Sequence, residues 1–262
     1  MSGPRSGLLR AALSRSEGPA LGTFVKLPSQ ETVELIAIAG FDFIVIDLEH
    51  APLDLETAFR HIGVALHLGV PSVVRVPGLA GGWIQRILDA GAEGIMLPHT
   101  DTAALAEEAV RAIRFEPWGT RGAGSTSRAG GWGSVPVEEY VRFGQEEVVF
   151  MPQIESAEAA RNAAAIAAVP GVDALFIGLA DLSANVGEPV GSATVTGLVD
   201  GVVQAARDRS LPLGGPAGTT RDAVQSMVGR GFTFCVQSND ASLFGAAATA
   251  AVAAGRSVRF DS

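Results

Sequence analysis

Residues Phe43 to Pro52 read FIVIDLEHAP and show a pattern that recurs along the chain. Its first part is a short apolar run of the kind that forms a strand buried on both faces of a parallel sheet. Its end carries three ionisable side chains, Asp47, Glu49 and His50, before Pro52 stops the strand. A buried strand that ends in two acids and a histidine indicates a sheet edge that opens onto a functional site.

The same pattern recurs along the chain, because short β-rich runs alternate with helical segments. Together with Phe43–Leu48, the expected strands are Gly22–Leu27, Ser72–Val76, Gly94–Leu97, Val148–Ile154, Ala174–Ile177, Leu211–Gly214 and Phe232–Val236. Strands that alternate with helices predict βα units and a parallel sheet. Eight such units in a chain of 262 residues predict a closed (β/α)8 barrel of the TIM type.

We expect a single domain over residues 1–262, because no linker or internal repeat interrupts the pattern. Residues 1–20 are expected to form an N-terminal helix and a lead-in, with Leu8, Leu9, Ala12 and Leu13 facing inward. A doubly wound open sheet is the alternative, but no dinucleotide-binding glycine motif follows the first strand. One connection, Phe115–Glu147, is long and rich in glycine and serine, and it is expected to reach across the barrel or into a neighbouring chain.

The composition excludes several classes of function. With 28 acidic and 19 basic side chains and a formal charge of −9, the chain lacks the basic footprint of a nucleic-acid-binding protein and does not attract anionic membranes. No apolar run in the sequence is long enough to span a bilayer. Cys235, the one cysteine, lies in an apolar run, which predicts a core residue and a reducing, cytoplasmic location.

Polar side chains collect at the carboxyl ends of five consecutive expected strands, the second to the sixth. They are Asp47, Glu49 and His50, then Arg75, then His99, then Gln153 and Glu155, and finally Asp181. Active sites of (β/α)8 barrels lie at these ends, so the pattern predicts one shared site. Structural roles stay open for Arg75 in an ion pair, Glu155 beside a helix start and Asp181 in a turn. His99 has no evident partner, and the role of Glu49 stays open.

These residue types favour metal-assisted formation of an enolate. Glu155 and Asp181, on adjacent strands, are two oxygen ligands for a hard divalent cation such as Mg²⁺ or Mn²⁺. Arg75 can stabilise charge that develops on an oxygen, and His50 beside a carboxylate is a general base. The backbone amides of Ala180 and Asp181 offer a place for a substrate carboxylate.

The segments GFDFIVIDLEHAP, VVRVP, RFEPWGTRGAGS, MPQIES and FIGLADLS, in this order and spacing, resemble the HpcH/HpaI family of metal-dependent, class II pyruvate aldolases. The resemblance covers nearly the whole chain. It implies a phosphoenolpyruvate/pyruvate-like (β/α)8 barrel, a divalent cation (Mg²⁺, Mn²⁺ or Co²⁺), and a homo-oligomer, a hexamer or trimer of dimers, with an exchanged C-terminal helix. The implied substrates are a small 2-keto acid such as pyruvate and an aldehyde that the sequence does not name.

The resemblance also implies roles for individual residues. The metal ligands fall on Glu155 and Asp181, the enolate-stabilising arginine on Arg75, and the base dyad on His50 and Asp47, acting through a metal-bound water. The implied substrate-binding residues are Gln153, Gly178, Ala180, Asp181 and Arg121, the last at the distal end of the aldehyde half. Lys26, the only lysine, is not expected to form a Schiff base.

Three departures from the family pattern concern the loop at the sixth strand, the end of the eighth, and the seventh strand, where LGGPAG is richer in glycine than usual. Leu179 stands where family members have a proline, and because proline fixes φ, we expect a looser loop around Asp181. Ser238 occupies a place where glycine is usual. Two alternative functions follow. One is an acyl-CoA lyase of the citrate-lyase branch, which the acidic balance disfavours, and the other is a non-catalytic barrel that binds a 2-keto acid.

Overall fold

The computed structural model describes residues 7–259. Its eight strands are β1 (Ala20–Val25), β2 (Phe43–Asp47), β3 (Ser72–Arg75), β4 (Gly94–Leu97), β5 (Val149–Ile154), β6 (Leu175–Ile177), β7 (Leu213–Ala217) and β8 (Phe234–Asn239). Every neighbouring pair is parallel, and the sheet closes on itself because β1 pairs with both β2 and β8. The predicted (β/α)8 barrel is therefore confirmed.

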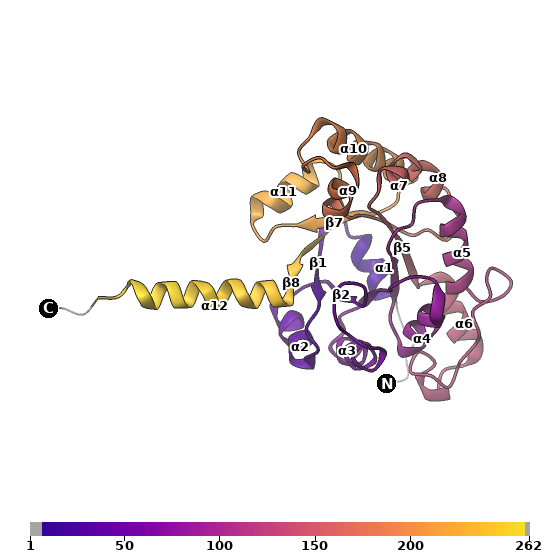
Figure 1. The fold of residues 1–262 in the computed structure, drawn as a ribbon. Coiled ribbons are helices and arrows are strands. Elements are labelled where there is room, and N and C mark those ends of the chain that lie inside the picture. The colour runs from indigo at the N-terminus through magenta and orange to yellow at the C-terminus, as the bar shows by residue number, and fades with distance from the viewer. Residues whose placement is uncertain (1–6, 260–262) are drawn as a thin grey trace.

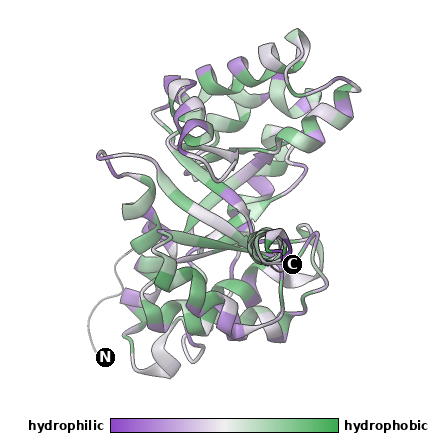
Figure 2. Cartoon of the chain, turned by 90° about the vertical axis from the view of Figure 1, so that its left-hand side faces the viewer, coloured by the Kyte–Doolittle hydropathy of each residue, from purple (hydrophilic) through white to green (hydrophobic). Residues whose placement is uncertain are grey.

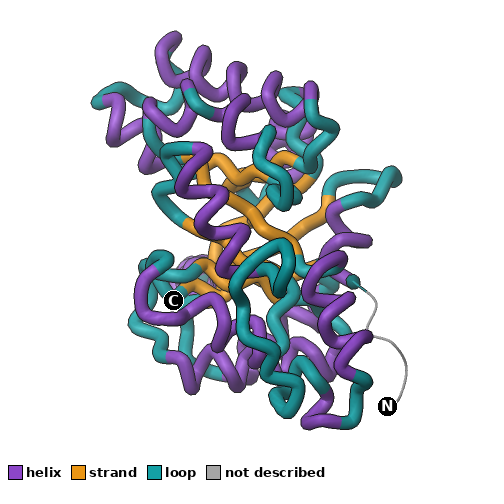
Figure 3. The backbone as a smooth tube through the Cα atoms, turned by 90° about the vertical axis from the view of Figure 1, so that its right-hand side faces the viewer, coloured by secondary structure: helices purple, strands orange, loops and turns teal. Residues whose placement is uncertain are grey.

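Helices form a layer around the strands, as Figures 1 and 3 show. They are α1 (Leu8–Leu13), α2 (Gln30–Ala39), α3 (Leu55–Leu68), α4 (Trp83–Ala90), α5 (Ala103–Ile113), α6 (Val137–Glu146), α7 (Ala157–Arg161), α8 (Ala163–Ala167), α9 (Leu179–Val186), α10 (Ala193–Asp208), α11 (Arg221–Gly229) and α12 (Asp240–Ser257). Several begin at a side-chain cap, such as Thr102, whose hydroxyl accepts a hydrogen bond from the amide of Leu105. Within residues 7–259, no helix is long and apolar enough to cross a membrane.

The apolar side chains of the strands form two layers, because successive residues of a strand point to opposite sides. In β2, Phe43 and Val45 belong to a cluster inside the barrel, whereas Ile44 and Ile46 pack outward with residues of the helices. Figure 2 shows the strands at the centre coloured mostly as hydrophobic. Burial on both sides explains why β2 reads as a continuous apolar run.

Helix α1 closes the barrel at the amino ends of the strands. Leu9 is fully buried in the interior cluster, and its amide donates a hydrogen bond to Glu93, directly before β4. Arg10 forms an ion pair with Asp173, shortly before β6. Figure 1 shows α1 behind the strands, close to the barrel axis. The open end is therefore the carboxyl end, where the polar residues at the strand ends lie.

The predicted inward face of the N-terminal helix needs one correction. Leu9 and Leu13 are buried, but Leu8 is 38% exposed because it lies on the outer side of this short helix. Residues 1–6 of the predicted lead-in lie outside the described residues.

The connection between α5 and β5 contains a helix that the sequence pattern did not predict. Its last part forms α6, in which Tyr140 and Phe143 are one turn apart and are both buried. Its middle part packs on its own barrel, because the guanidinium of Arg128 donates to the carbonyl of Phe59 in α3. The glycine and serine content concealed these contacts from the sequence pattern.

Strands β7 and β8 end three residues later than predicted. The ladder between them continues to Ala217 opposite Gln237. The additional residues are small or polar, which is typical of turns, so the sequence pattern ended both strands too early. Closure of the barrel keeps these residues paired as strands.

Candidate active site

Successive residues of each strand point alternately into and out of the barrel, and several polar side chains at the strand ends point inward. Along β2, β3 and β5, the interior positions run from Phe43 and Val45 to Asp47, from Val73 to Arg75, and from Val149 and Met151 to Gln153 and then Glu155. Asp47 also lies opposite Arg75 in the register of β2 and β3. Period-two geometry therefore places these four polar residues on the interior side, as the strand-end pattern predicted.

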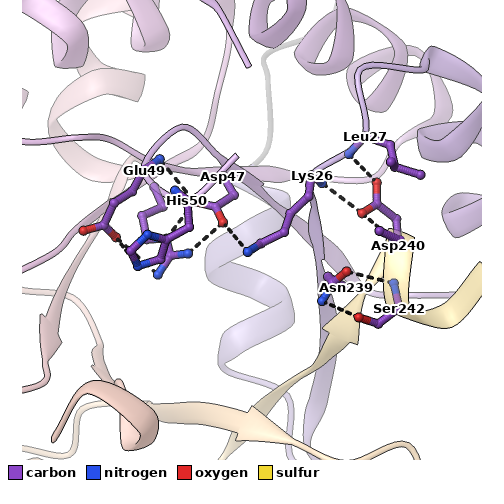
Figure 4. A network of polar contacts seen from close by, with 10 residues as sticks. Lys26, Leu27, Asp47, Glu49, His50, Asn239, Asp240 and Ser242 are labelled. Atoms are coloured by element: carbon purple, nitrogen blue, oxygen red, sulfur yellow. Dashed lines mark hydrogen bonds and ion pairs between the residues drawn. The ribbon is translucent and has the colours of Figure 1, made fainter. Parts of the chain in front are cut away.

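Asp47 and Arg75 form a buried, two-pronged ion pair. Arg75 Nε lies 3.0 Å from Oδ1 of Asp47, and Nη2 lies 2.7 Å from Oδ2. The guanidinium also lies 4.8 Å from the ring centroid of Phe24. Lys26 Nζ approaches Oδ2 of Asp47 to 3.2 Å, and Figure 4 shows it reaching across from the end of β1. This contact occupies the one amine that a Schiff base would need.

The pKa of Asp47 reflects these contacts. Burial alone would raise it, but the hydrogen bonds and charge of Arg75, with the His50 amide and Lys26, lower it below its ordinary value of 3.8. The stability that this carboxylate contributes is thus present above pH 3.8 and is lost as the pH falls through the lowered pKa. Asp47 serves as a fixed acceptor at neutral pH.

Arg75→Met is expected to lower the free energy of unfolding by about 3–5 kcal/mol, because it leaves the Asp47 carboxylate buried with a weaker partner set. Urea unfolding of the variant and the wild type measures this loss. Arg230→Met is the matched control, since Arg230 pairs with Asp200 at the surface, where such a pair contributes about 1 kcal/mol or less. Equal losses for both variants would show that Arg75 has no special structural role.

Glu155 is the second buried carboxylate of the site, and it is only 3% exposed. Its Oε1 accepts a hydrogen bond of 2.7 Å from the backbone amide of His99, and its Oε2 accepts one from the side chain of Gln153. Burial raises the pKa of Glu155 above its ordinary value of 4.5, and the nearby charges of Glu49 and Asp181 raise it further, against an opposing effect of His99. A cation bound here would relieve that repulsion.

The start of α9 lies directly against Glu155. A Cβ atom on Gly178 would come within 2.8 Å of the Glu155 Cβ and 3.0 Å of the Gln153 amide nitrogen, so only glycine permits this approach. Leu179 is the first helical residue and packs partly buried against the core, and the amide of Leu182 donates to the Gly178 carbonyl. Leu179 thus begins α9, and Ala180 and Asp181 lie in its exposed first turn.

Glu49 and His99 also enter the site, although the sequence left both without a role. His99 Nδ1 lies 3.0 Å from Oε1 of Glu155, and His99 Nε2 lies 3.4 Å from Oε1 of Glu49. Glu49 Oε2 in turn lies 3.3 Å from Nη1 of Arg75. Glu49, His99 and Glu155 each present a ligand atom, and these atoms lie within 4.8 Å of one another. Three of the predicted strand ends therefore meet at one group of potential metal ligands.

His50 contacts Asp47 through its backbone rather than its ring. The His50 amide donates to Oδ1 of Asp47 at 3.1 Å, while the imidazole Nε2 lies 3.7 Å from Oε2 of Glu49. The His50 side chain is 53% exposed at the mouth of the barrel, as Figure 4 shows beside Asp47 and Glu49. Asp47 thus orients the chain at His50, and Glu49 is the carboxylate that faces its ring.

Arg121 lies apart from this group. Its guanidinium donates to Asp89 at 2.8 Å and to Tyr140 at 3.2 Å, and it stacks 4.5 Å from the ring centroid of Phe115. The side chain is almost fully buried against α4 and α6 of its own barrel. Among residues 7–259, its recorded partners include none of the other predicted site residues.

Comparison with known proteins places this site in a family. The sequence profile of the HpcH/HpaI aldolase/citrate lyase family matches residues 20–247, which include all eight strands of the barrel. The chain belongs to this family. The match contains every predicted site residue, so the HpcH/HpaI resemblance inferred from the sequence is confirmed.

Individual relatives of this HpcH/HpaI protein support the assignment. The 2-dehydro-3,6-dideoxy-6-sulfogluconate aldolase of Pseudomonas putida is 33% identical over 87% of this chain and 89% of its own length. The hydroxypyruvate/pyruvate aldolase of Pseudomonas aeruginosa is 42% identical, over 66% of this chain and 64% of its own length. A solved HpcH/HpaI aldolase/citrate lyase family structure from Burkholderia cenocepacia is 32% identical, with a TM-score of 0.88 over 96% of this chain and 100% of that one.

The donor atoms of this HpcH/HpaI site fit a divalent cation. Carboxylate oxygens from Glu49 and Glu155 and a nitrogen from His99 converge there, and hard divalent ions prefer oxygen-rich sets of this kind. The side-chain oxygen of Gln153 is buried and lacks a hydrogen-bond partner among residues 7–259, although its amide nitrogen bonds Glu155. An orphaned buried oxygen beside a carboxylate is an additional acceptor for a cation or its ligands.

Proposed function

We propose that this chain is a metal-dependent class II aldolase. It cleaves or forms a 4-hydroxy-2-keto acid, with pyruvate or a related 2-keto acid as one partner and an aldehyde as the other. The chain is thus a carbon–carbon lyase. One observation carries the proposal: at the open end of the barrel, Glu49 contacts Arg75 of the Asp47–Arg75 pair, and the ring of His99 lies between Glu49 and the buried carboxylate of Glu155.

Glu155 and Asp181 are the proposed ligands of the divalent cation (Mg²⁺, Mn²⁺ or Co²⁺). Asp181 contributes negative charge near Glu155 from the first turn of α9. When bound, such a cation polarises the keto carbonyl and acidifies the adjacent carbon. The backbone amides of Ala180 and Asp181, at the start of α9, are the proposed donors to the keto-acid carboxylate, because helix amino ends favour negative charge. Gln153 adds a polar side chain at the same place.

Arg75 is the proposed stabiliser of the enolate oxygen. Three of its nitrogens already face Asp47 and Glu49, and these contacts hold the guanidinium plane fixed. A guanidinium has five N–H donors, so the outer nitrogens keep donors for a substrate oxygen. A donor that is fixed before the reaction stabilises developing charge without reorganisation.

His50 is the proposed proton carrier, because its imidazole stands exposed at the mouth of the barrel and faces Glu49. In cleavage, the base removes the proton of the 4-hydroxyl group, the C3–C4 bond breaks, and its electron pair passes to the enolate as the aldehyde leaves. Return of a proton to C3 then gives the 2-keto acid. Asp47 is the proposed positioning residue for His50, because its carboxylate accepts a hydrogen bond from the His50 backbone amide.

A half-reaction tests the proposal without knowledge of the aldehyde. When the Mn²⁺-loaded protein is incubated with pyruvate in deuterium oxide, the methyl protons of pyruvate are expected to exchange for deuterons. NMR measures this exchange. A panel of aldehydes, including succinic semialdehyde, lactaldehyde, tartronate semialdehyde and glyceraldehyde, then identifies the acceptor with each metal. A protein that neither exchanges these protons nor consumes pyruvate with any aldehyde does not have the proposed activity.

Helix α12 supports the proposed homo-oligomer. Its base is fixed by Asp240, which accepts hydrogen bonds from the amides of Lys26 and Leu27, as Figure 4 shows. Beyond its base the helix extends away from the barrel (Figure 1), with Phe244 73% exposed and Val252 52% exposed. A helix of this length gains its stability mainly from packing, so a second copy of the chain is the proposed cover. Light scattering in solution gives the number of copies.

A further inference from the structure

His99 has an unusual backbone that directs both its amide and its ring toward Glu155. It ends the segment after β4 with a φ of +51°, a left-handed conformation that few non-glycine residues adopt. Its amide donates to Oε1 of Glu155 at 2.7 Å. Such a conformation costs about 1–3 kcal/mol and persists where the surroundings demand it, which is most often at functional sites.

The ring of His99 bridges two carboxylates. Nδ1 lies 3.0 Å from Oε1 of Glu155, and Nε2 lies 3.4 Å from Oε1 of Glu49. Glu155 is buried, and Glu49 is held by Arg75 on its other oxygen. The ring itself is 70% exposed, toward the open end of the barrel. The imidazole therefore contacts both carboxylates and leaves much of its surface open to solvent.

We propose that His99 Nδ1 is a direct ligand of the divalent cation, together with Glu155, and that Glu49 fixes the ring by accepting a hydrogen bond from Nε2. This inference rests on the proposed function, since it assigns further residues to the same metal. Adjacent ligands of an octahedral ion with bonds of about 2.1 Å are about 3.0 Å apart, which matches the separation of Nδ1 and Oε1. Metal-ligating histidines commonly donate their second nitrogen to a carboxylate in this way.

A second observation points to a ligand at the same place. Gln153 is 1% exposed, and its side-chain oxygen has no hydrogen-bond partner among residues 7–259. Its nitrogen contacts Oε2 of Glu155, the oxygen that His99 does not use. The amide is thus anchored at the carboxylate, with an acceptor left over for a bound ion or the molecule that the ion holds.

The nitrogen ligand changes which metals the site prefers. An all-oxygen site suits Mg²⁺ and Mn²⁺, whereas imidazole ligation favours later transition metals such as Co²⁺, Ni²⁺ and Zn²⁺. The ratio of Co²⁺ to Mg²⁺ affinity is therefore expected to be high in the wild type. It should fall at least about tenfold when His99 is replaced, since ligand-sphere changes commonly alter metal affinity by 10- to 100-fold.

Pulsed EPR of the protein loaded with Mn²⁺ alone tests the assignment, because a directly bound imidazole gives a ¹⁴N coupling. The informative variant is His99→Asn, since asparagine also tolerates a positive φ. His67→Ala is the matched control, as His67 lies exposed on α3. We expect the coupling in the wild type and in the control, its replacement by a ¹⁵N coupling after labelling with [¹⁵N]histidine, and its loss in His99→Asn.

Three outcomes separate this inference from the proposed function. Tight Mn²⁺ binding without nitrogen coupling in the wild type would overturn the role of His99 and leave the aldolase proposal standing. Coupling that persists in His99→Asn would assign the nitrogen to another residue, such as His50. If calorimetry shows no binding of Mn²⁺ to the wild type, both proposals fail. Glu49→Gln adds a check, because it should keep the coupling while it weakens Mn²⁺ binding.

Discussion

Glu155→Gln is expected to lower the rate of pyruvate methyl exchange by about 10³-fold. The substitution keeps the shape of the side chain and removes its negative charge. Glu155 is a proposed metal ligand both with Asp181 and with His99, and each proposal requires that charge. A bound cation contributes several kcal/mol to charge stabilisation in a transition state, and each 1.4 kcal/mol corresponds to about a factor of ten. NMR of the exchange reaction, at a metal concentration that saturates the wild type, measures the loss.

Glu155→Gln is expected to stabilise the metal-free protein, although it lowers the rate of exchange. Because burial first, and then Glu49 and Asp181, raise the pKa of Glu155 above 4.5, the folded protein binds more protons than the unfolded chain between the two pKa values. The carboxylate therefore costs stability, and the cost is complete above its raised pKa. In chelator at neutral pH, Glu155→Gln is expected to have a higher Tm than the wild type.

Added metal is expected to reverse that order. A ligand at 100 times its Kd stabilises the wild type by about 2.7 kcal/mol, which raises the Tm by roughly 5 °C or more for a chain of this size. The variant should gain no such increase. Equal Tm increases with Mn²⁺ in both proteins would mean that Glu155 does not bind the cation, and Glu158→Gln, on the exposed face of α7, is the control for a change of charge alone.

His50→Ala is expected to lower turnover by about 10²–10⁴-fold, which is the range for loss of a general base. The ring is half exposed and contacts Glu49 only at 3.7 Å, so the variant should fold and bind metal as the wild type does. The loss should appear in kcat more than in KM, because the ring is proposed to act in the proton-transfer step rather than in substrate binding. Steady-state pyruvate release and the exchange reaction provide the two measurements.

His67→Ala controls for loss of a histidine, since the His67 ring hydrogen-bonds the Gly63 carbonyl within its own helix. It is expected to change turnover by less than about threefold, as surface substitutions normally leave function intact. A loss of less than threefold in His50→Ala as well would remove His50 from the mechanism. The proton would then have to pass through another group near Glu49, of which His99 is the nearest titratable ring.

The alternation of eight strands with helices predicted the barrel, and the polar residues at the strand ends predicted where most of the candidate site lies. Residues that continue an interior apolar row, such as Asp47 after Val45 and Arg75 after Val73, must point into the open end of the barrel. That inference needs only the sequence and the knowledge that strands are parallel. The HpcH/HpaI resemblance added Gly178 and a substrate-binding role for Gln153, and the structure places both residues next to Glu155.

Contacts that depend on loop conformation could not be predicted in the same way. His99 reaches Glu155 because its backbone is left-handed, and nothing in PHT at residues 98–100 requires that conformation. The ring of His50 faces Glu49 rather than Asp47 because the chain turns directly after β2. Arg121 depends on α6, which the glycine-rich composition of its connection concealed. Its implied contact with the aldehyde stays a prediction.

We propose that a divalent cation at this site is required to form the enolate. Methyl-proton exchange of pyruvate in deuterium oxide, measured after exhaustive EDTA treatment and again after Mn²⁺ is restored, tests this requirement. We predict exchange at the protein-free rate in chelator and recovery on addition of the metal. Exchange that continues undiminished in the metal-free protein would show that the enolate forms without a bound cation.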